Sequence, residues 1–246
     1  MPTFDVHAYY GETLFSSSMA SPEAVRQSLA QTGTDAVALI STLAADCDFV
    51  AGNRALRPAL HADSGVYGWV TLNAGYSDLS QEEQRRYLGR REFVGAVMFG
   101  ADGRPVTLDD AREVLNAHRR YTKPMALFAP DGDAVHAATR IATEFPAMRF
   151  LLLGMGGDDW RAAVAAAHHH LNIFLELSGS LDADKVSLAS ASLTPRKLLY
   201  GSGAPRRDPA QAQALVADAA GLTASDRSRI LSLNAGAFLN VQSDAE

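Results

Sequence analysis

The residues best suited to chemistry near the start of the chain are Asp5, His7 and Tyr9, which alternate along an apolar segment. In an extended strand, residues two apart point to the same face, so these side chains would share one side of a strand. The His7 imidazole could act as a base, donate a hydrogen bond or bind a metal ion. The Tyr9 phenol, with an ordinary pKa of about 10, is a poor ligand at neutral pH. We therefore expect Asp5, His7 and Tyr9 to be the catalytic group of any active form. The alternative is that His7 is a buried histidine held by its neighbours.

The run His168-His169-His170 looks like a metal cluster, but its spacing argues against one. Consecutive helical residues point about 100° apart, so three in a row cannot converge on one ion. We expect this run to face solvent at the end of a helix. His61, His118 and His136 fall within predicted helices and are not assigned to a site.

Eight short segments rich in Val, Ile, Leu and Phe alternate with helix-forming segments and would position these residues. Such segments, apolar on both faces, are typical of buried parallel strands. The predicted strands are 3–7, 36–40, 66–72, 93–99, 124–128, 149–153, 173–176 and 197–200. Helix starts are expected at Ser21, Ser80, Thr107 and Thr223, each followed by acidic residues.

This alternation predicts an α/β fold, a single (β/α)8 TIM barrel, for which about 250 residues is the usual length. An open doubly wound sheet is the alternative, but the glycine fingerprint expected after its first strand is missing. We expect one domain over residues 1–246, with a core of 1–241 and a frayed tail of 242–246.

The composition narrows the range of partners and compartments. A net charge of −6 argues against a nucleic-acid partner, and no apolar run is long enough to span a membrane. The single cysteine, Cys47, excludes an internal disulfide and, with no secretory segment apparent, favours the cytoplasm.

In a barrel, the loops after the last two strands often bind phosphate through backbone N–H groups. Here those loops carry Ser178-Gly179-Ser180 and Gly201-Ser202-Gly203, followed by Arg206 and Arg207. An anion site at these loops is one possibility, although turn formation alone could explain the glycines.

Four segments, in order along the whole chain, resemble the amidohydrolase-related barrels. These are Asp5-Val6-His7-Ala8-Tyr9, Asn172 to Gly179, Gly201-Ser202-Gly203-Ala204-Pro205, and Ile230 to Leu239. The resemblance is to the metal-dependent hydrolase superfamily, in the branch of aminocarboxymuconate-semialdehyde decarboxylase with its related decarboxylases and lactonases. It implies a metal site at the carboxyl ends of the strands.

Carried over position by position, the family's metal ligands are mostly missing from this chain. The second histidine of the opening pair falls on Tyr9, the fifth-strand histidine on Phe128, and the sixth-strand histidine on Gly154. The eighth-strand aspartate falls on Gly203, so only His7 remains. Because a catalytic metal needs about three protein ligands, we expect no divalent metal and no other cofactor.

Three functions follow as hypotheses. The first is a non-catalytic barrel that pairs with or regulates an active relative, or binds a small molecule. The second is a metal-independent, lactonase-like hydrolase that acts on a small organic acid through His7; a decarboxylase activity is also open. The third is a phosphate- or carboxylate-binding module at the loops after the seventh and eighth strands. The partners expected are a small organic acid and a second copy or an active relative, without nucleic acid or membrane. The residues expected to line a binding site are Tyr10, Phe128, Gly154, Ser178, Ser202, Gly203 and Arg206.

Overall fold

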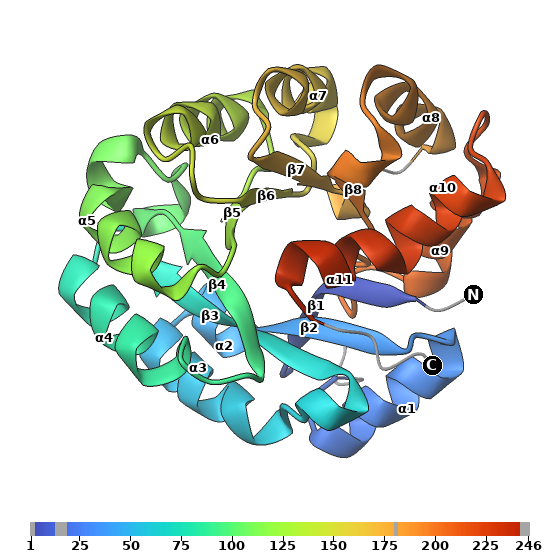
Figure 1. The fold of residues 1–246 in the computed structure, drawn as a ribbon. Helices are drawn as coiled ribbons and strands as arrows, with labels where there is room; N and C mark the ends of the chain where they lie inside the picture. Colours follow the sequence, from blue (N-terminus) through green and yellow to red (C-terminus); the bar gives the residue numbers. More distant parts are fainter. Residues whose placement is uncertain (1–2, 13–18, 180–181, 242–246) are drawn as a thin grey trace.

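The protein folds as a (β/α)8 barrel, as the alternating pattern predicts. The structure is a computed structural model that describes residues 3–12, 19–179 and 182–241. Its eight strands form one parallel sheet in sequential order, with helices around the outside (Figure 1). The strands are β1 Phe4–Tyr10, β2 Ala36–Ser41, β3 Val66–Asn73, β4 Phe93–Phe99, β5 Met125–Phe128, β6 Phe150–Leu153, β7 Ile173–Glu176 and β8 Leu198–Leu199. The expected tail, 242–246, lies outside the described residues.

The barrel closes where β1 meets the end of β8. The Val6 N–H donates to the Tyr200 carbonyl at 3.0 Å, and the Gly203 N–H donates to the His7 carbonyl at 2.7 Å. Further along, Ala8 and Ala204 form a parallel bridge. β1 therefore runs three residues beyond the predicted end, whereas β8 is shorter than predicted because the Tyr200 N–H turns to the Ile230 carbonyl.

The helices are α1 Pro22–Thr32, α2 Thr42–Asp46, α3 Phe49–Leu56, α4 Ser77–Tyr87, α5 Leu108–His118, α6 Gly132–Glu144, α7 Trp160–His169, α8 Ala183–Ser192, α9 Pro209–Asp218, α10 Ala224–Ser228 and α11 Asn234–Leu239. Ser21, Thr107 and Thr223 cap helices as predicted. The expected start at Ser80 is wrong. α4 begins at Ser77, and the buried Ser80 hydroxyl instead donates to the Asn73 carbonyl at 2.8 Å.

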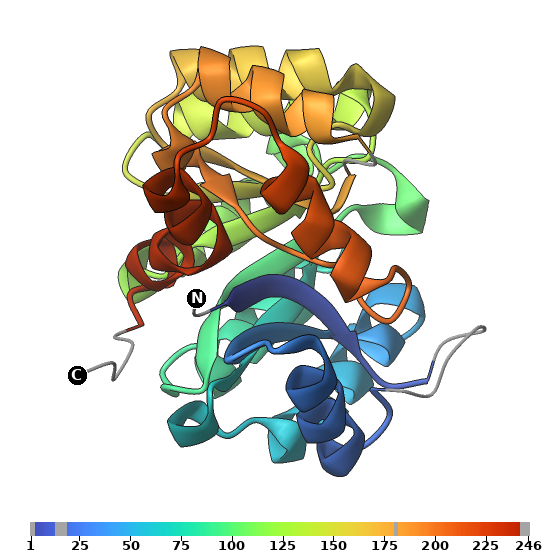
Figure 2. The same ribbon diagram turned by 90° about the vertical axis from the view of Figure 1, so that its right-hand side faces the viewer.

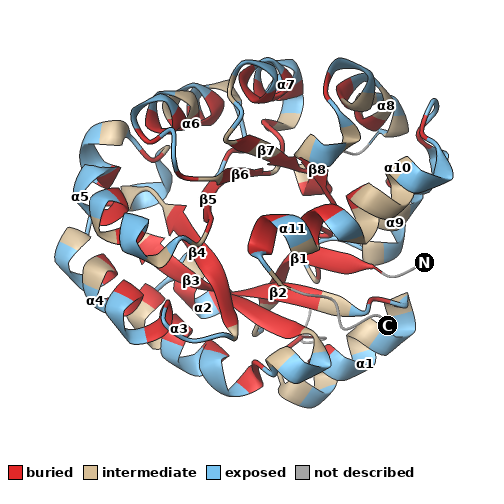
Figure 3. Ribbon diagram, in the orientation of Figure 1, coloured by how far each residue is buried: buried red, intermediate tan, exposed pale blue. Residues whose placement is uncertain are grey.

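The apolar core has two layers, and the strands are buried on both faces (Figure 3). One layer fills the barrel interior and includes Val6, Trp69, Val97 and Leu151. The other lies between the strands and the surrounding helices.

The last helix closes the amino end of the barrel. Phe238 and Leu239 of α11 belong to the interior apolar layer, and Figure 2 shows the final helices beside β1. The Asn234 amide donates to the carbonyls of Pro195 and Leu198, at 2.7 and 2.8 Å, where β8 begins. The opposite, carboxyl end of the barrel is thus left for the candidate site. Among the described residues, no helix has the length and apolar character needed to cross a membrane.

Candidate functional site

His7, near the carboxyl end of β1, pairs with a carboxylate from the opposite side of the β1–β8 seam. Its Nδ1 lies 3.0 Å from Glu176 Oε2 and 3.2 Å from Ser178 Oγ. Glu176 ends β7, and Ser178 follows in the short helical turn Leu177–Gly179. All three side chains are buried. Because the strands are parallel and sequential, β7 and β1 bring residues 169 positions apart into contact.

Both oxygens of Glu176 accept hydrogen bonds from its surroundings. Oε1 accepts from the Ser178 N–H at 2.6 Å, while Oε2 accepts from the Gly154 N–H at 3.0 Å and the Ser178 hydroxyl at 2.7 Å. Burial by itself raises the pKa of Glu176, but His7, Ser178 and the Gly154 N–H together lower it below its usual value. Glycine is required at Gly201, because a Cβ there would lie 2.2 Å from Glu176 Oε1. The cluster of His7, Glu176, Ser178 and the Gly154 N–H is called the Glu176 cluster below.

The second ring nitrogen of His7 stands out within this cluster. His7 Nε2 is buried and has no hydrogen-bond partner among the described residues. A buried polar atom without a partner is uncommon in folded proteins and costs stability unless something else satisfies it. It is therefore the atom of the site most open to a further interaction.

Asp5 hydrogen-bonds to backbone N–H groups and to a serine hydroxyl rather than to the His7 ring. Its Oδ1 accepts from the backbone N–H groups of His7 and Ser202, both at 3.0 Å, and its Oδ2 accepts from the Ser202 hydroxyl at 2.5 Å. The register of β1 against β2 shifts between Asp5 and Ala8, which breaks the simple alternation of faces. Burial raises the pKa of Asp5 to about 6, although the bonds from Ser202 and His7 oppose this.

The Tyr9 ring, near the carboxyl end of β1, packs against the His7 ring and the Arg206 guanidinium. Its ring meets the His7 ring edge-on with centroids 5.1 Å apart, and the Arg206 guanidinium sits 4.1 Å above its centre. Arg206 also pairs with Asp46 at 2.5 Å. Burial raises the pKa of Tyr9 to about 12, partly offset by Arg206. The phenol therefore stays protonated at neutral pH.

Four of the other residues expected at the site fall into two groups. Gly154 and Ser178 contact Glu176, while Ser202 and Gly203 contact β1. Tyr10 is half-buried, and its carbonyl accepts from the Thr42 hydroxyl at 3.1 Å. Phe128, 40% exposed, ends β5 and packs against Phe99 with ring centroids 6.0 Å apart.

Glu176 was missed by the sequence reasoning, although a signal for it was present. It is a carboxylate at the end of a predicted parallel strand, two residues before a serine. Strand-end carboxylates in barrels lie at the face where binding and catalysis occur. The run His168-His169-His170, by contrast, lies at the end of α7 with His168 and His169 exposed, as expected.

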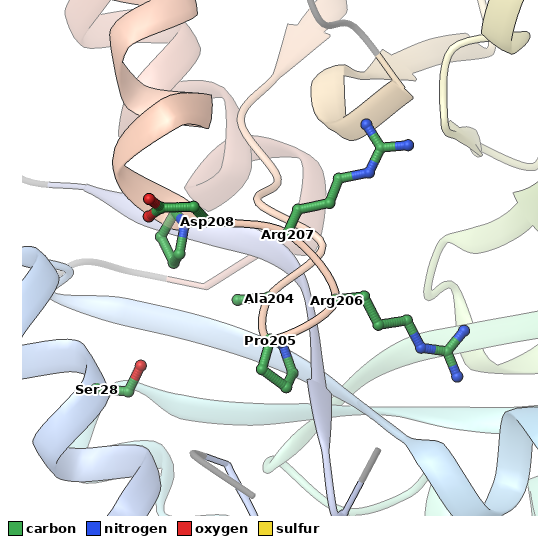
Figure 4. A pocket seen from close by; sticks show the side chains of 7 residues that line it. Ser28, Ala204, Pro205, Arg206, Arg207 and Asp208 are labelled. Atoms are coloured by element: carbon green, nitrogen blue, oxygen red, sulfur yellow. The ribbon is translucent and has the colours of Figure 1, made fainter. Parts of the chain in front are cut away.

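A polar cavity of about 330 Å³ lies between α1 and the loop after β8, and is lined by Ser28, Ala204, Pro205, Arg206, Arg207, Asp208 and Pro209. Figure 4 shows Ser28 across from Pro205, with the side chains of Arg206 and Arg207 diverging from the loop. Arg206 is held by Asp46, and the Arg207 guanidinium donates to the Ser178 carbonyl. The two cations expected to bind an anion are therefore already engaged with the protein.

Among the described residues, the side chains at the carboxyl end form no ready set of ligands for a divalent metal ion. Within the described ranges, no three or more His, Cys, Asp or Glu side chains are grouped so that they could hold one. Both oxygens of Asp5 and both of Glu176 already accept hydrogen bonds. A catalytic zinc site needs three protein ligands with an open position, and this set does not supply them.

Comparison with known proteins points to one family. The family model described as amidohydrolase matches residues 15–241. No curated protein matches the chain at a significant level.

The solved structures most like this fold include 2,6-dihydroxybenzoate decarboxylase from Rhizobium, 16% identical, with 99% of this chain and 100% of that chain covered and a TM-score of 0.74. Another is 5-carboxyvanillate decarboxylase from Novosphingobium aromaticivorans, complexed with manganese, at 11% identity, 97% and 96% coverage and a TM-score of 0.75. A third is 4-oxalomesaconate hydratase from Rhodopseudomonas palustris, at 12% identity, 97% and 96% coverage and a TM-score of 0.71. At these identities the likeness is one of fold.

Proposed function

Because this chain belongs to the amidohydrolase family, whose model spans most of its length, we propose that it is a member that works without the family's metal ion. In this proposal it is a non-catalytic barrel that binds a small organic acid at its carboxyl end, alone or paired with an active relative. Its place in the cell would be the cytoplasm.

The proposal rests on the types of side chain that occupy the positions of the family's metal ligands at the carboxyl end of the barrel. The resemblance puts family ligands at Tyr9, Phe128, Gly154 and Gly203, and none of these supplies a metal donor at neutral pH. The ligand that remains, His7, already bonds Glu176 through Nδ1. Hydrogen bonds between side chains and backbone thus hold together the part of the barrel where a metal would otherwise sit.

Metal content and ligand binding test the proposal together. The chain, purified without chelators, should hold far less than one equivalent of manganese, zinc or iron by elemental analysis. Added 2,6-dihydroxybenzoate, which is bound in one solved structure of a 2,6-dihydroxybenzoate decarboxylase, serves as the organic-acid probe. It should raise the melting temperature without releasing CO2, with or without added Mn²⁺. One tightly held ion per chain, or metal-dependent turnover, would contradict the proposal.

Exposed apolar side chains at the carboxyl end support the paired form of the proposal. Leu43 follows β2, Tyr76 follows β3, and Phe128 ends β5, each at least 40% exposed. Apolar side chains gathered near one end are typical of a surface that meets another molecule. Light scattering should then give the mass of an assembly that Tyr76→Ser weakens. A monomer at every concentration would exclude pairing with a second copy, and would leave the small-molecule form and pairing with an active relative.

A second candidate function, metal-independent hydrolysis, is favoured by one specific feature. A carboxylate that orients an imidazole, with the other ring nitrogen unpartnered, is the arrangement of a general base. A screen of lactones and esters with the wild-type chain and His7→Gln would test it. Turnover that disappears in His7→Gln would favour the enzyme over the binding barrel.

A further inference from the structure

The Glu176 cluster fixes more than the position of His7. Glu176 accepts hydrogen bonds from two N–H groups and from the Ser178 hydroxyl, which is the pattern of an ionised carboxylate that can only accept. The proton between His7 Nδ1 and Glu176 Oε2 must therefore belong to the imidazole. Ser178 Oγ, 3.2 Å from Nδ1, donates its own proton to Glu176 and so presents a lone pair to the same N–H.

With one proton fixed on Nδ1, the protonation of Nε2 decides which ligand groups can bind there. A protonated Nε2 would be a buried cationic N–H without an acceptor, which costs more than an unpartnered lone pair. A lone pair accepts from an O–H or N–H donor but repels a carboxylate or carbonyl oxygen. The ring of Tyr9 packs edge-on against His7, and both side chains are buried.

We propose that Glu176 is a positioning residue that holds His7 as the tautomer protonated on Nδ1, and that Nε2 thereby forms a buried acceptor site for a ligand hydroxyl group. This deepens the proposed function and rests on it, since a metal ion on His7 would occupy the same nitrogen. The hydroxyl group of the ligand, rather than its carboxylate, would be the part that His7 recognises.

Nuclear magnetic resonance of ¹⁵N-labelled histidine tests the tautomer directly. In wild type, His7 should show a protonated Nδ1 and an unprotonated Nε2. His118 supplies an internal reference of opposite kind, because its Nε2 lies 2.9 Å from the Lys123 carbonyl and must be the protonated nitrogen. Wild-type His7 protonated on Nε2, or on both nitrogens at pH 7, would overturn the assignment without any variant.

The variant Glu176→Gln should shift His7 toward the Nε2-protonated form, because an amide can donate to Nδ1. The same exchange of carboxylate for amide gives the wrong histidine tautomer in a serine protease. Glu83→Gln is the matched control: Glu83 is equally buried but bonds Asn53 and Arg86, far from His7. It should leave the His7 signals unchanged. Folded Glu176→Gln protein with wild-type His7 signals would overturn the positioning role.

Two uncharged probes distinguish a ligand that can donate a hydrogen bond to His7 Nε2 from one that can only accept a hydrogen bond. Cyclohexanol and cyclohexanone share a ring that suits the apolar side chains at this end, including Tyr9 and Phe128. Cyclohexanol should shift the His7 Nε2 resonance, and cyclohexanone should not. Equal shifts, or none from either probe, would overturn the acceptor site. Selective broadening of His7 by added Mn²⁺ would instead overturn the proposed function, so the two failures are distinguishable.

Discussion

At the scale of single residues, the site rests on two buried carboxylates with opposite titration behaviour. Asp5 and Glu176 are both buried, yet the pKa of Asp5 is raised to about 6 while that of Glu176 is lowered. The difference lies in their partners. Glu176 faces an imidazole, whereas Asp5 receives hydrogen bonds from neutral groups only. Hydrogen bonds to the ionised form offset the cost of burying it, and the imidazole gives Glu176 one more such bond than Asp5 has.

Asp5→Asn should flatten the dependence of stability on pH. Because the folded pKa of Asp5, about 6, lies above the unfolded value near 3.8, its contribution is present below pH 4 and lost as pH rises through 6. That difference corresponds to about 3 kcal/mol of unfolding free energy. Urea unfolding between pH 4 and pH 7 should show wild type losing about that much relative to Asp5→Asn. Parallel curves would show that Asp5 stays ionised at no cost.

His7→Ala should destabilise the fold as well as alter the site. Removing the imidazole takes one hydrogen-bond donor away from the buried Glu176 carboxylate, and a hydrogen bond to a charged group contributes about 1.5–3 kcal/mol. Thermal and urea unfolding would measure the loss. His136→Ala, on an exposed face of α6, is the control and should change stability little. A loss for His7→Ala no larger than that of the control would show that the contact between His7 and Glu176 contributes nothing to stability.

At the scale of elements, a helix side chain completes hydrogen bonding that strand pairing leaves open on β3. β2 pairs with β3 only as far as Leu39 and Gly68, so the rest of β3 has one strand neighbour. Asn53 of α3 hydrogen-bonds to the backbone groups of β3 that have no strand partner there. Its amide donates to the Thr71 carbonyl at 2.9 Å, and its carbonyl accepts from the Thr71 N–H at 2.8 Å. The same amide also donates to Glu83 of α4, which ties α3 and α4 to the strand.

Asn53→Ala should therefore cost more than an ordinary helix substitution. It leaves both backbone groups of Thr71 buried without partners, and each such group costs about 1–3 kcal/mol. We expect a loss of about 3 kcal/mol by urea unfolding. Asn116→Ala, exposed on α5, is the control and should be neutral or slightly stabilising. Equal effects of the two substitutions would show that solvent reaches Thr71.

The elements were largely predictable from sequence, and the exceptions have local causes. The predicted strands 93–99 and 173–176 match β4 and β7 to the residue, because buried parallel strands are continuous apolar runs. Ser80 misled because the Ser-Gln-Glu-Glu pattern imitates a capping box, while the helix begins one turn earlier. The pairing of His7 with Glu176 could not be read from spacing, since it joins β1 to β7 between residues 169 positions apart in the chain.

At the scale of the whole molecule, the two ends of the barrel are built differently. The amino end is closed by α11, whose Phe238 packs against Phe174 of β7 with ring centroids 4.8 Å apart. The carboxyl end is tied by the Glu176 cluster across the seam between β1 and the last strands. Apolar side chains close the amino end of the barrel. A ligand would therefore enter at the carboxyl end, beside the Glu176 cluster, as is general for this fold.

Phe238→Ala tests whether the last helix closes the barrel as part of one cooperative unit. Phe238 belongs to the interior layer and is 3% exposed, so its truncation leaves a cavity between α11 and the strands. Losses of about 3–5 kcal/mol are usual for buried phenylalanines. Leu233→Ala, 49% exposed just before α11, is the control and should change stability far less.

The slope of the urea transition then separates two kinds of failure. If α11 folds together with the barrel, Phe238→Ala lowers the midpoint and leaves the slope unchanged, because the same surface is exposed on unfolding. If α11 is a separate unit, the variant releases it early and the slope of the main transition falls. In that case α11 would separate from the barrel while the strands stay folded, and the barrel interior would be exposed to solvent at its amino end.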